Sequence, residues 1–157
     1  MAEQKDCEKD FSKTLNTINV NYTGAVSILN IISNDMEQNK NGFIVGVSSV
    51  AGDRGRKANY IYGSSKAAFS AYLSGLRNRL HESGVKVLTV KPGFVATKMT
   101  AKLDLPTKLT AQPEDVAKDI FTAQQKGKDI LYTKPIWRVI MMIIKIIPEW
   151  KFKGMSI

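Results

Sequence analysis

Cysteine and histidine are nearly absent from this chain, which has one of each among its 157 residues. The single cysteine, Cys7, excludes an internal disulfide and a cysteine-built zinc site, and the single histidine, His81, excludes a metal site that needs several imidazoles. We therefore expect no metal site, and a reducing compartment, which means a cytoplasmic location. Cys7 has no basic, structured surroundings that would make its thiol reactive, and His81 fits a surface position near a helix end.

A long hydrophobic run is also missing. The longest apolar stretch, Val139–Ile147, is interrupted by Lys145 and is far shorter than the roughly 20 residues that span a bilayer. Met1–Asp10 is polar and charged, so we expect a polar lead-in there and no secretory signal. Because 43% of the residues are hydrophobic and 24% are charged, the composition is that of one globular domain over residues 1–157.

Acidic residues are fewer than basic ones, which gives a net charge of +9. The 23 lysines and arginines are spread along the chain, without a run of five and without interleaved aromatic residues. This pattern does not favour a nucleic acid partner, since single-strand binding needs stacking aromatic side chains along a basic groove. The local exception is the tail, residues 134–157, which is apolar and has five basic residues and one acidic residue.

Helical and strand-like stretches alternate along the chain, which predicts an α/β fold with a parallel sheet. Short apolar runs are typical of strands buried on both faces, and Pro113 suits the first turn of a helix. The residues between the second strand and that helix, Phe94–Thr110, look irregular or lid-like. The expected helices are Phe11–Gln38, Tyr60–Glu82, Pro113 to near Gly127 and Trp137–Ile147, and the expected strands are Phe43–Val47, Val85–Val90 and Asp129–Tyr132.

Tyr62 and Lys66 stand four residues apart in the second expected helix, which places a phenol and an ammonium on one helix face. A tyrosine normally titrates near pH 10, and a neighbouring cation lowers its pKa by stabilising the phenolate. Such a pair can exchange protons as a general acid and base. The pair alone is weak evidence, because a solvated helix face offers the same spacing by chance.

Three further motifs accompany this pair. Ser48 and Ser49 follow the first strand, and Ser49 lies thirteen residues before Tyr62. A Pro-Gly-x-x-x-Thr motif, Pro92 to Thr97, follows the second strand, and Asn21 stands three residues before Gly24 in the first helix. In this order and at these spacings, from about Phe11 to Tyr132, the sequence resembles the short-chain dehydrogenase/reductase family.

This resemblance implies an oxidoreductase that uses NADP or NAD on a small-molecule carbonyl or secondary alcohol, with a Ser-Tyr-Lys-Asn constellation. Tyr62 would exchange a proton with the substrate oxygen, Ser49 would position that oxygen, and Lys66 would lower the Tyr62 pKa and hold the nicotinamide ribose. Asn21 would kink its helix and hold a water of a proton relay. The implied catalytic residues are Asn21, Ser49, Tyr62 and Lys66, and the implied cofactor-binding residues are Tyr62, Lys66, Pro92, Gly93, Val95 and Thr97.

Several of these assignments have alternatives. Ser48 competes with Ser49, and Asn19 competes with Asn21, although spacing favours Ser49 and Asn21. Thr97 could be a simple turn or cap residue. The alternative for the whole chain is a non-catalytic remnant or an interaction module that has lost the site for the dinucleotide phosphates.

That alternative arises because no glycine-rich strand–turn–helix motif occurs in the sequence. Such a turn receives the cofactor pyrophosphate in a complete dinucleotide-binding fold. The expected fold is therefore a partial Rossmann-like, doubly wound parallel sheet that lacks its N-terminal βαβ units, and the isolated chain should bind nicotinamide cofactor poorly.

Three further partners are expected. The tail resembles that of family reductases acting on polyprenyl-phosphate keto-sugars, which makes a lipid-linked keto-sugar a candidate substrate. Its apolar and basic residues also suggest peripheral contact with the inner face of a membrane, as an alternative to a closing helix over the pocket. The two long helices have a family precedent as a subunit interface, so we expect a homo-oligomer, dimer or tetramer.

Overall fold

A three-stranded parallel sheet forms the centre of the computed structural model, which describes residues 3–101 and 103–155. Its strands are β1 (Phe43–Val47), β2 (Lys86–Pro92) and β5 (Ile130–Thr133), in the spatial order β1-β2-β5. Val47 lies opposite Val90, and Pro92 lies opposite Thr133, so the carboxyl ends of all three strands meet at one edge. The three strands and the α/β class predicted from the sequence are confirmed.

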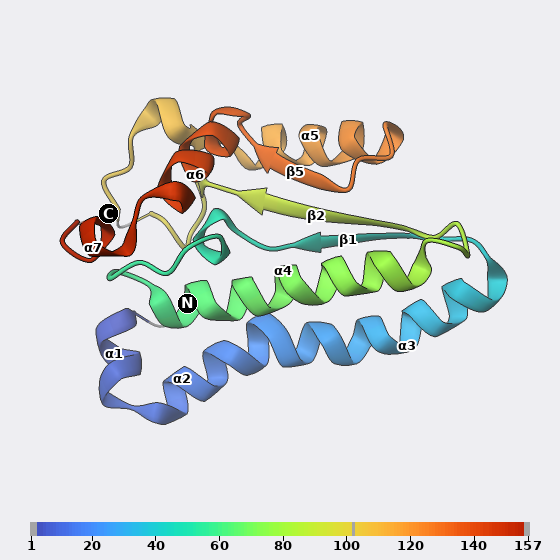
Figure 1. The fold of residues 1–157 in the computed structure, drawn as a ribbon, viewed down its shortest axis with the longest axis horizontal. Coiled ribbons are helices and arrows are strands. Elements are labelled where there is room, and N and C mark those ends of the chain that lie inside the picture. Colours follow the sequence, from blue (N-terminus) through green and yellow to red (C-terminus); the bar gives the residue numbers. More distant parts are fainter. Residues whose placement is uncertain (1–2, 102, 156–157) are drawn as a thin grey trace.

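Helices cover the two faces of the sheet unequally (Figure 1). On one face, α4 (Tyr60–Leu80) packs directly on β1 and β2, and α3 (Gly24–Asn39) lies outside it. The contact between α4 and β1 is close, because a side chain at Gly46 would collide with Leu73. On the other face, α5 (Pro113–Gln125) packs mainly on β2 and β5. As a result Val45 and Val47 of β1 remain 39% and 48% exposed.

The sequence predicted one continuous helix over Phe11–Gln38, but the structure interrupts it. It consists of α2 (Phe11–Ile18), a π-helical turn η1 (Asn19–Thr23) and α3. Asp10 caps α2 by accepting a hydrogen bond from the Ser12 amide. In the π turn the Gly24 amide donates to the Asn19 carbonyl, five residues back, which inserts one extra residue into the helix.

The polar lead-in expected over Met1–Asp10 is wrong for its described part, because Gln4–Lys9 forms a short helix, α1. Tertiary contacts stabilise this helix. The Gln4 side chain accepts a hydrogen bond from the Ile61 amide at the start of α4, and Glu8 accepts one from the Tyr60 hydroxyl. The buried Cys7 faces Thr17 of α2. A pattern within six residues cannot reveal such partners.

The tail crosses the carboxyl edge of the sheet as two helices, α6 (Ile136–Ile146) and α7 (Glu149–Phe152), as Figure 1 shows. The segment expected to be irregular, Phe94–Thr110, contains short elements instead. These are β3 (Phe94–Val95), the 3-10 turn η3 (Thr107–Leu109) and the start of β4 (Thr110–Ala111), which pairs in parallel with β3.

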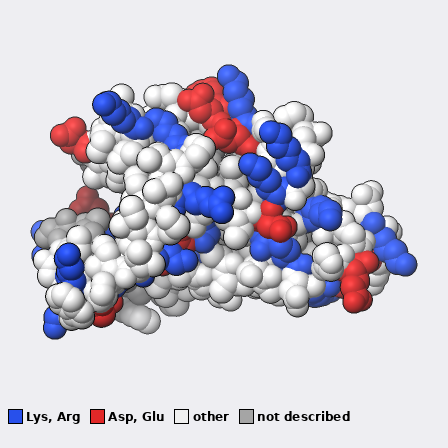
Figure 2. Space-filling model, turned by 45° about the horizontal axis from the view of Figure 1, so that its top comes forward, with Lys and Arg blue, Asp and Glu red and all other residues white. Residues whose placement is uncertain are grey.

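Charged side chains are scattered over the surface seen in Figure 2, with the acidic groups among the basic ones. This agrees with the even spread of charge along the sequence. Among the residues that the structure describes, no helix combines the length and the apolar character needed to cross a bilayer.

Candidate active site

The first strand of the sheet delivers two serines to the carboxyl edge. The Ser48 hydroxyl is occupied by α4, where it donates to the Lys66 carbonyl and pairs with the Ser70 hydroxyl at 2.7 Å. Ser49 caps the 3-10 turn η2 (Val50–Gly52), with its hydroxyl oxygen 3.1 Å from the Ala51 amide nitrogen. Ser48 therefore fastens the strand end to the helix, and the geometry favours Ser49 as the serine next to Tyr62.

Tyr62 and Lys66 lie one turn apart in the first half of α4, as the spacing predicts. Gly63 allows the start of this helix to approach η2, because a side chain there would collide with the Ala51 carbonyl. The Lys66 ammonium lies 5.9 Å from the centre of the Tyr62 ring and donates a hydrogen bond to the Val47 carbonyl at 3.1 Å. Ser49, Tyr62 and Lys66 thus come together at the end of β1.

Burial sets the protonation of the pair. Burial raises the pKa of Tyr62, and the hydrogen-bonding side chain of Ser49 lowers that pKa by a smaller amount. Lys66, whose own pKa is lowered by burial, sits over the ring and is held by a backbone carbonyl. The net result in this structure is a raised Tyr62 pKa, so the phenol is protonated at neutral pH, and the lowering of that pKa by Lys66 stays a prediction.

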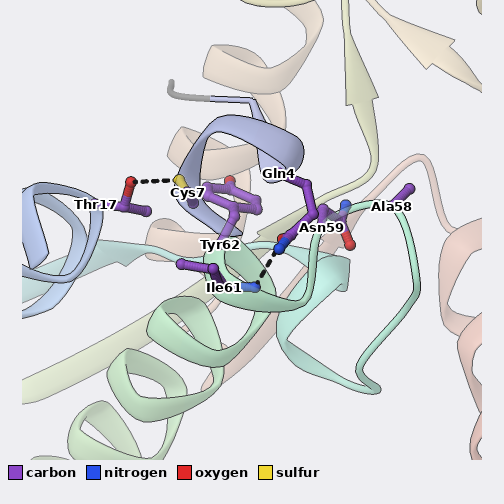
Figure 3. A pocket seen from close by; sticks show the side chains of 7 residues that line it. All are labelled: Gln4, Cys7, Thr17, Ala58, Asn59, Ile61 and Tyr62. Atoms are coloured by element: carbon purple, nitrogen blue, oxygen red, sulfur yellow. Dashed lines mark hydrogen bonds between the residues drawn. The ribbon is translucent and has the colours of Figure 1, made fainter. Parts of the chain in front are cut away.

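Tyr62 is buried by elements that also line a small recess beside it (Figure 3). Its walls come from α1, from α2 and from the start of α4, and the Tyr62 ring lies beside Cys7 in the close-up view. The helix α1, which the sequence did not predict, thereby covers one side of the candidate acid. The residues lining the recess are Gln4, Cys7, Thr17, Ala58, Asn59, Ile61 and Tyr62.

Asn21 lies in the π turn, which packs against α4. It is half-buried, whereas Asn19 is exposed, and this difference favours Asn21 of the two candidates. The Asn21 amide donates to the Thr17 carbonyl at 2.9 Å. Among residues 3–101 and 103–155, no hydrogen bond links Asn21 to Lys66 or to Tyr62.

The Pro92–Thr97 motif follows β2 at the same edge. Gly93 lies against the indole of Trp137, with which any side chain at this position would collide. The half-buried Val95 belongs to β3. Thr97 is exposed, and its amide and carbonyl both bond to the Thr100 hydroxyl, as in a turn. The observed contacts of Thr97 are therefore those of a turn residue, the alternative considered for it above.

Asp53, which the sequence did not indicate, links the loop that carries Ser49 to the other two strands of the sheet, β2 and β5. Its carboxylate, with a side chain only 3% exposed, accepts hydrogen bonds from Lys91 of β2 and from the Tyr132 hydroxyl of β5. Burial and the bond to Asp53 raise the pKa of Tyr132 well above its ordinary value. No spacing in the sequence indicates this cluster, since its members come from three elements.

Arg54, the next residue, binds the tail. Its guanidinium donates to the Ile144 and Ile147 carbonyls at 2.7 and 2.6 Å and forms an ion pair with Glu149. It also lies 3.7 Å from the centre of the Phe152 ring. Val50 packs against Trp137, Met141 and Ile144. The loop after Ser49 is therefore fixed to the sheet on one side and to the tail on the other.

The chain is similar to known proteins of one family. The family model described as short chain dehydrogenase matches residues 2–107. An uncharacterized oxidoreductase of Mycobacterium tuberculosis is 33% identical over 155 residues, which are 99% of this chain and 62% of the relative. The chain thus spans about three fifths of the length of this relative and of a similar Streptomyces coelicolor protein.

Solved structures share the fold. A Burkholderia cenocepacia short chain dehydrogenase in complex with NADP is 23% identical, with a TM-score of 0.77, covering 85% of this chain and 56% of that one. A short chain dehydrogenase/reductase from Burkholderia phymatum in complex with NAD is 20% identical, with a TM-score of 0.65, covering 80% of this chain and 54% of that one. With two thirds of its residues inside the matching family model, this chain belongs to the short chain dehydrogenase family.

Proposed function

We propose that this chain carries the catalytic constellation of an NADP- or NAD-dependent oxidoreductase that acts on a carbonyl or a secondary alcohol. The observation that supports this function best is the cluster of Ser49, Tyr62 and Lys66 at the carboxyl end of β1. In open parallel α/β sheets, ligands bind outside the carboxyl ends of the strands. The Pro92–Thr97 segment emerges at this same edge.

In the proposed reaction, the Tyr62 phenol donates its proton to the substrate carbonyl oxygen while the Ser49 hydroxyl holds that oxygen by a hydrogen bond. Burial raises the Tyr62 pKa, so the phenol is in the protonated form that a reduction requires. The Lys66 ammonium stabilises the phenolate that remains after proton transfer. Asn21, in the π turn against α4, is the proposed holder of a relay water.

The residues present fit the nicotinamide end of a cofactor. The Lys66 ammonium has three N–H donors and gives one to the Val47 carbonyl, which leaves donors for ribose hydroxyls. Pro92, Gly93, Val95 and Thr97 supply backbone next to it. When bound, the nicotinamide supplies the hydride. The NADP and NAD in the two Burkholderia structures support either form of the cofactor.

The test is hydride transfer from NADPH and from NADH to a panel of ketones, with matched tyrosine variants. Tyr62→Phe removes the proton donor and should lower the rate at least a hundredfold, because general acid catalysis contributes about 10²–10⁴-fold. Tyr60→Phe, two residues away and hydrogen-bonded to Glu8, should leave the rate unchanged. Equal loss in both variants would contradict the assignment of Tyr62.

The same assay should be run on this chain alone and on the chain co-expressed with the portion of the M. tuberculosis relative that it does not match. We expect the chain alone to bind NADPH more weakly than micromolar in calorimetry, since its sequence contains no glycine-rich phosphate turn. Activity in neither form would favour the non-catalytic alternative.

We also propose a cytoplasmic homo-oligomer that uses a lipid-linked keto-sugar among its substrates. Exposed apolar side chains along α2 and α3, such as Phe11 and Ile31, support a subunit interface between the long helices. Light scattering should then give at least a dimer, and Ile31→Glu should shift it toward the monomer. A polyprenyl-phosphate keto-sugar should be reduced faster than the free keto-sugar if the substrate class is right.

A further inference from the structure

The tail helix α6 has an apolar outward face as well as an apolar inward one. Trp137, Met141 and Ile144 point inward, where they pack with Val50 under the Arg54 guanidinium. On the opposite side, four large apolar residues are 47–74% exposed, although a solvent-facing helix normally places polar residues there. These outward residues are Val139, Met142, Ile143 and Ile146.

The next helix, α7, also exposes a large apolar side chain. Trp150 is 74% exposed, which is unusual for an indole in an aqueous surface and typical of one at a membrane interface. Trp137, the other tryptophan, is buried and donates its N–H to the Leu109 carbonyl. The two indoles therefore have distinct environments: that of Trp137 is packed in the core, and that of Trp150 faces outward.

Charge decides what kind of partner fits this face. Four exposed cations accompany the apolar residues in this part of the tail: Arg138, Lys145, Lys151 and Lys153. The one acid of the tail, Glu149, forms an ion pair with Arg54. A second copy docking through the same face would bring the same four cations to it, whereas an anionic lipid surface attracts each such cation.

Arg54 holds this face in place. By donating to carbonyls at the end of α6 and stacking on Phe152, it fixes both tail helices to the loop that carries Ser49. The apolar side chains are thus presented on a folded, anchored helix pair, which needs no ordering upon binding.

We propose that α6 and α7 dock this chain onto an anionic phospholipid membrane, with Met142, Ile146 and Trp150 entering the interface and the four cations lying among the headgroups. The helices lie in the plane of the interface and do not span it. The docking surface, called the tail face here, consists of the four outward residues, Trp150 and the four cations.

The test is binding of the 157-residue chain to vesicles of phosphatidylcholine with and without phosphatidylglycerol, measured by co-sedimentation and by tryptophan emission. We expect binding to the anionic vesicles only, with a blue shift from Trp150 that is lost in Trp150→Phe. Arg138→Gln with Lys145→Gln should weaken binding by about 25-fold, because each cation near an anionic surface contributes about fivefold.

A matched pair of variants separates the tail face from general apolar stickiness. Ile146→Glu on α6 and Phe121→Glu on α5 replace residues that are 74% and 63% exposed, with the same change in charge. We expect Ile146→Glu to lower vesicle binding at least tenfold and Phe121→Glu to lower it little.

Three results would overturn the docking proposal: equal loss in the two variants, equal binding to neutral vesicles, or no binding at all. A change in oligomeric mass for Ile146→Glu without any vesicle binding would identify the tail face as a contact between copies. Tyr62→Phe should bind vesicles like the natural sequence, so docking can fail or hold independently of the proposed enzymatic function.

Discussion

Two loops flank the candidate site, and they are held in different ways. The loop over residues 48–59 is tied to β2 and β5 by Asp53 and to the tail by Arg54. The second loop, residues 96–101 and 103–109, is mostly exposed, and near its start the Thr100 hydroxyl bonds to Val95 and Thr97 close by. A shallow groove opens beside this second loop, lined by Thr97, Leu103 and others.

The fold requires more order in the first loop than in the second. The first loop carries Ser49, whose hydroxyl in the proposed reaction stays within reach of Tyr62 during proton transfer, so loss of the loop's anchors should affect the whole edge. The second loop is held to the tail at its end, where Lys134 and Trp137 donate hydrogen bonds to the Lys108 and Leu109 carbonyls, while its start borders the open groove. The comparison predicts large effects of substitution in the first loop and small ones in the second.

The largest effect should follow Asp53→Ala. The substitution leaves the Lys91 ammonium and the Tyr132 hydroxyl buried without their shared partner, and breaking a buried ion pair costs about 3–5 kcal/mol. Urea denaturation should show this loss in the free energy of unfolding. Asp104→Ala, which removes an exposed carboxylate from the second loop, is the control and should change the free energy by less than about 0.5 kcal/mol.

Arg54→Ala should have the next largest effect, about 2–3 kcal/mol, because a guanidinium that donates to several carbonyls is lost. Limited proteolysis should then cut α6 and α7 before the rest of the chain. Arg54→Lys keeps the positive charge but loses the several N–H donors of the guanidinium, so its loss of stability should lie between those of the natural sequence and Arg54→Ala. Uniform cleavage along the chain would show that Arg54 does not anchor the tail.

The third effect concerns pH. Burial and Asp53 raise the pKa of Tyr132 above its ordinary value, so the unfolded chain loses this proton first. This contribution to stability is fully present below about pH 10 and declines above it, by up to about 1.4 kcal/mol per pH unit. Tyr132→Phe should unfold with a shallower dependence on pH in urea titrations above pH 10. An unchanged slope would contradict the raised pKa.

The smallest effect should come from Thr100→Val in the second loop. The substitution removes bonds to the Val95 carbonyl and the Thr97 amide, both near solvent, which costs about 0.5–1 kcal/mol. Hydrogen exchange at the Thr97 amide should accelerate, while the amides of β1 and β2 keep their protection. A loss as large as that of Asp53→Ala would remove the contrast between the loops.

The cluster of Ser49, Tyr62 and Lys66 could be predicted from the sequence because local rules place each member. Two residues share a helix face, and the third follows a recognisable strand. The Asp53 cluster could not be predicted, since its partners lie 38 and 79 residues away in the sequence. Only the register of the sheet, with Lys91 opposite Tyr132, brings them together.

Much of the fold was predictable for the same reason. Apolar runs and proline or glycine boundaries located the three strands and the helix α5. The helix α1 was not predictable, because its six residues depend on α4, which follows more than 50 residues later. The raised pKa of Tyr62 could not be predicted, because the spacing of Tyr62 and Lys66 reveals the neighbouring cation but not the burial to which α1 contributes.

The π turn between α2 and α3 has a consequence for how this helix tolerates changes in length. The extra residue rotates α2 by about 100° relative to the path that α3 alone would continue. Deleting one residue within Asn19–Thr23 would leave a regular α-helix with every hydrogen bond satisfied. It would also turn Thr17 and the residues before it relative to α4, so the regular helix would lose the contacts with α4 that the π turn preserves.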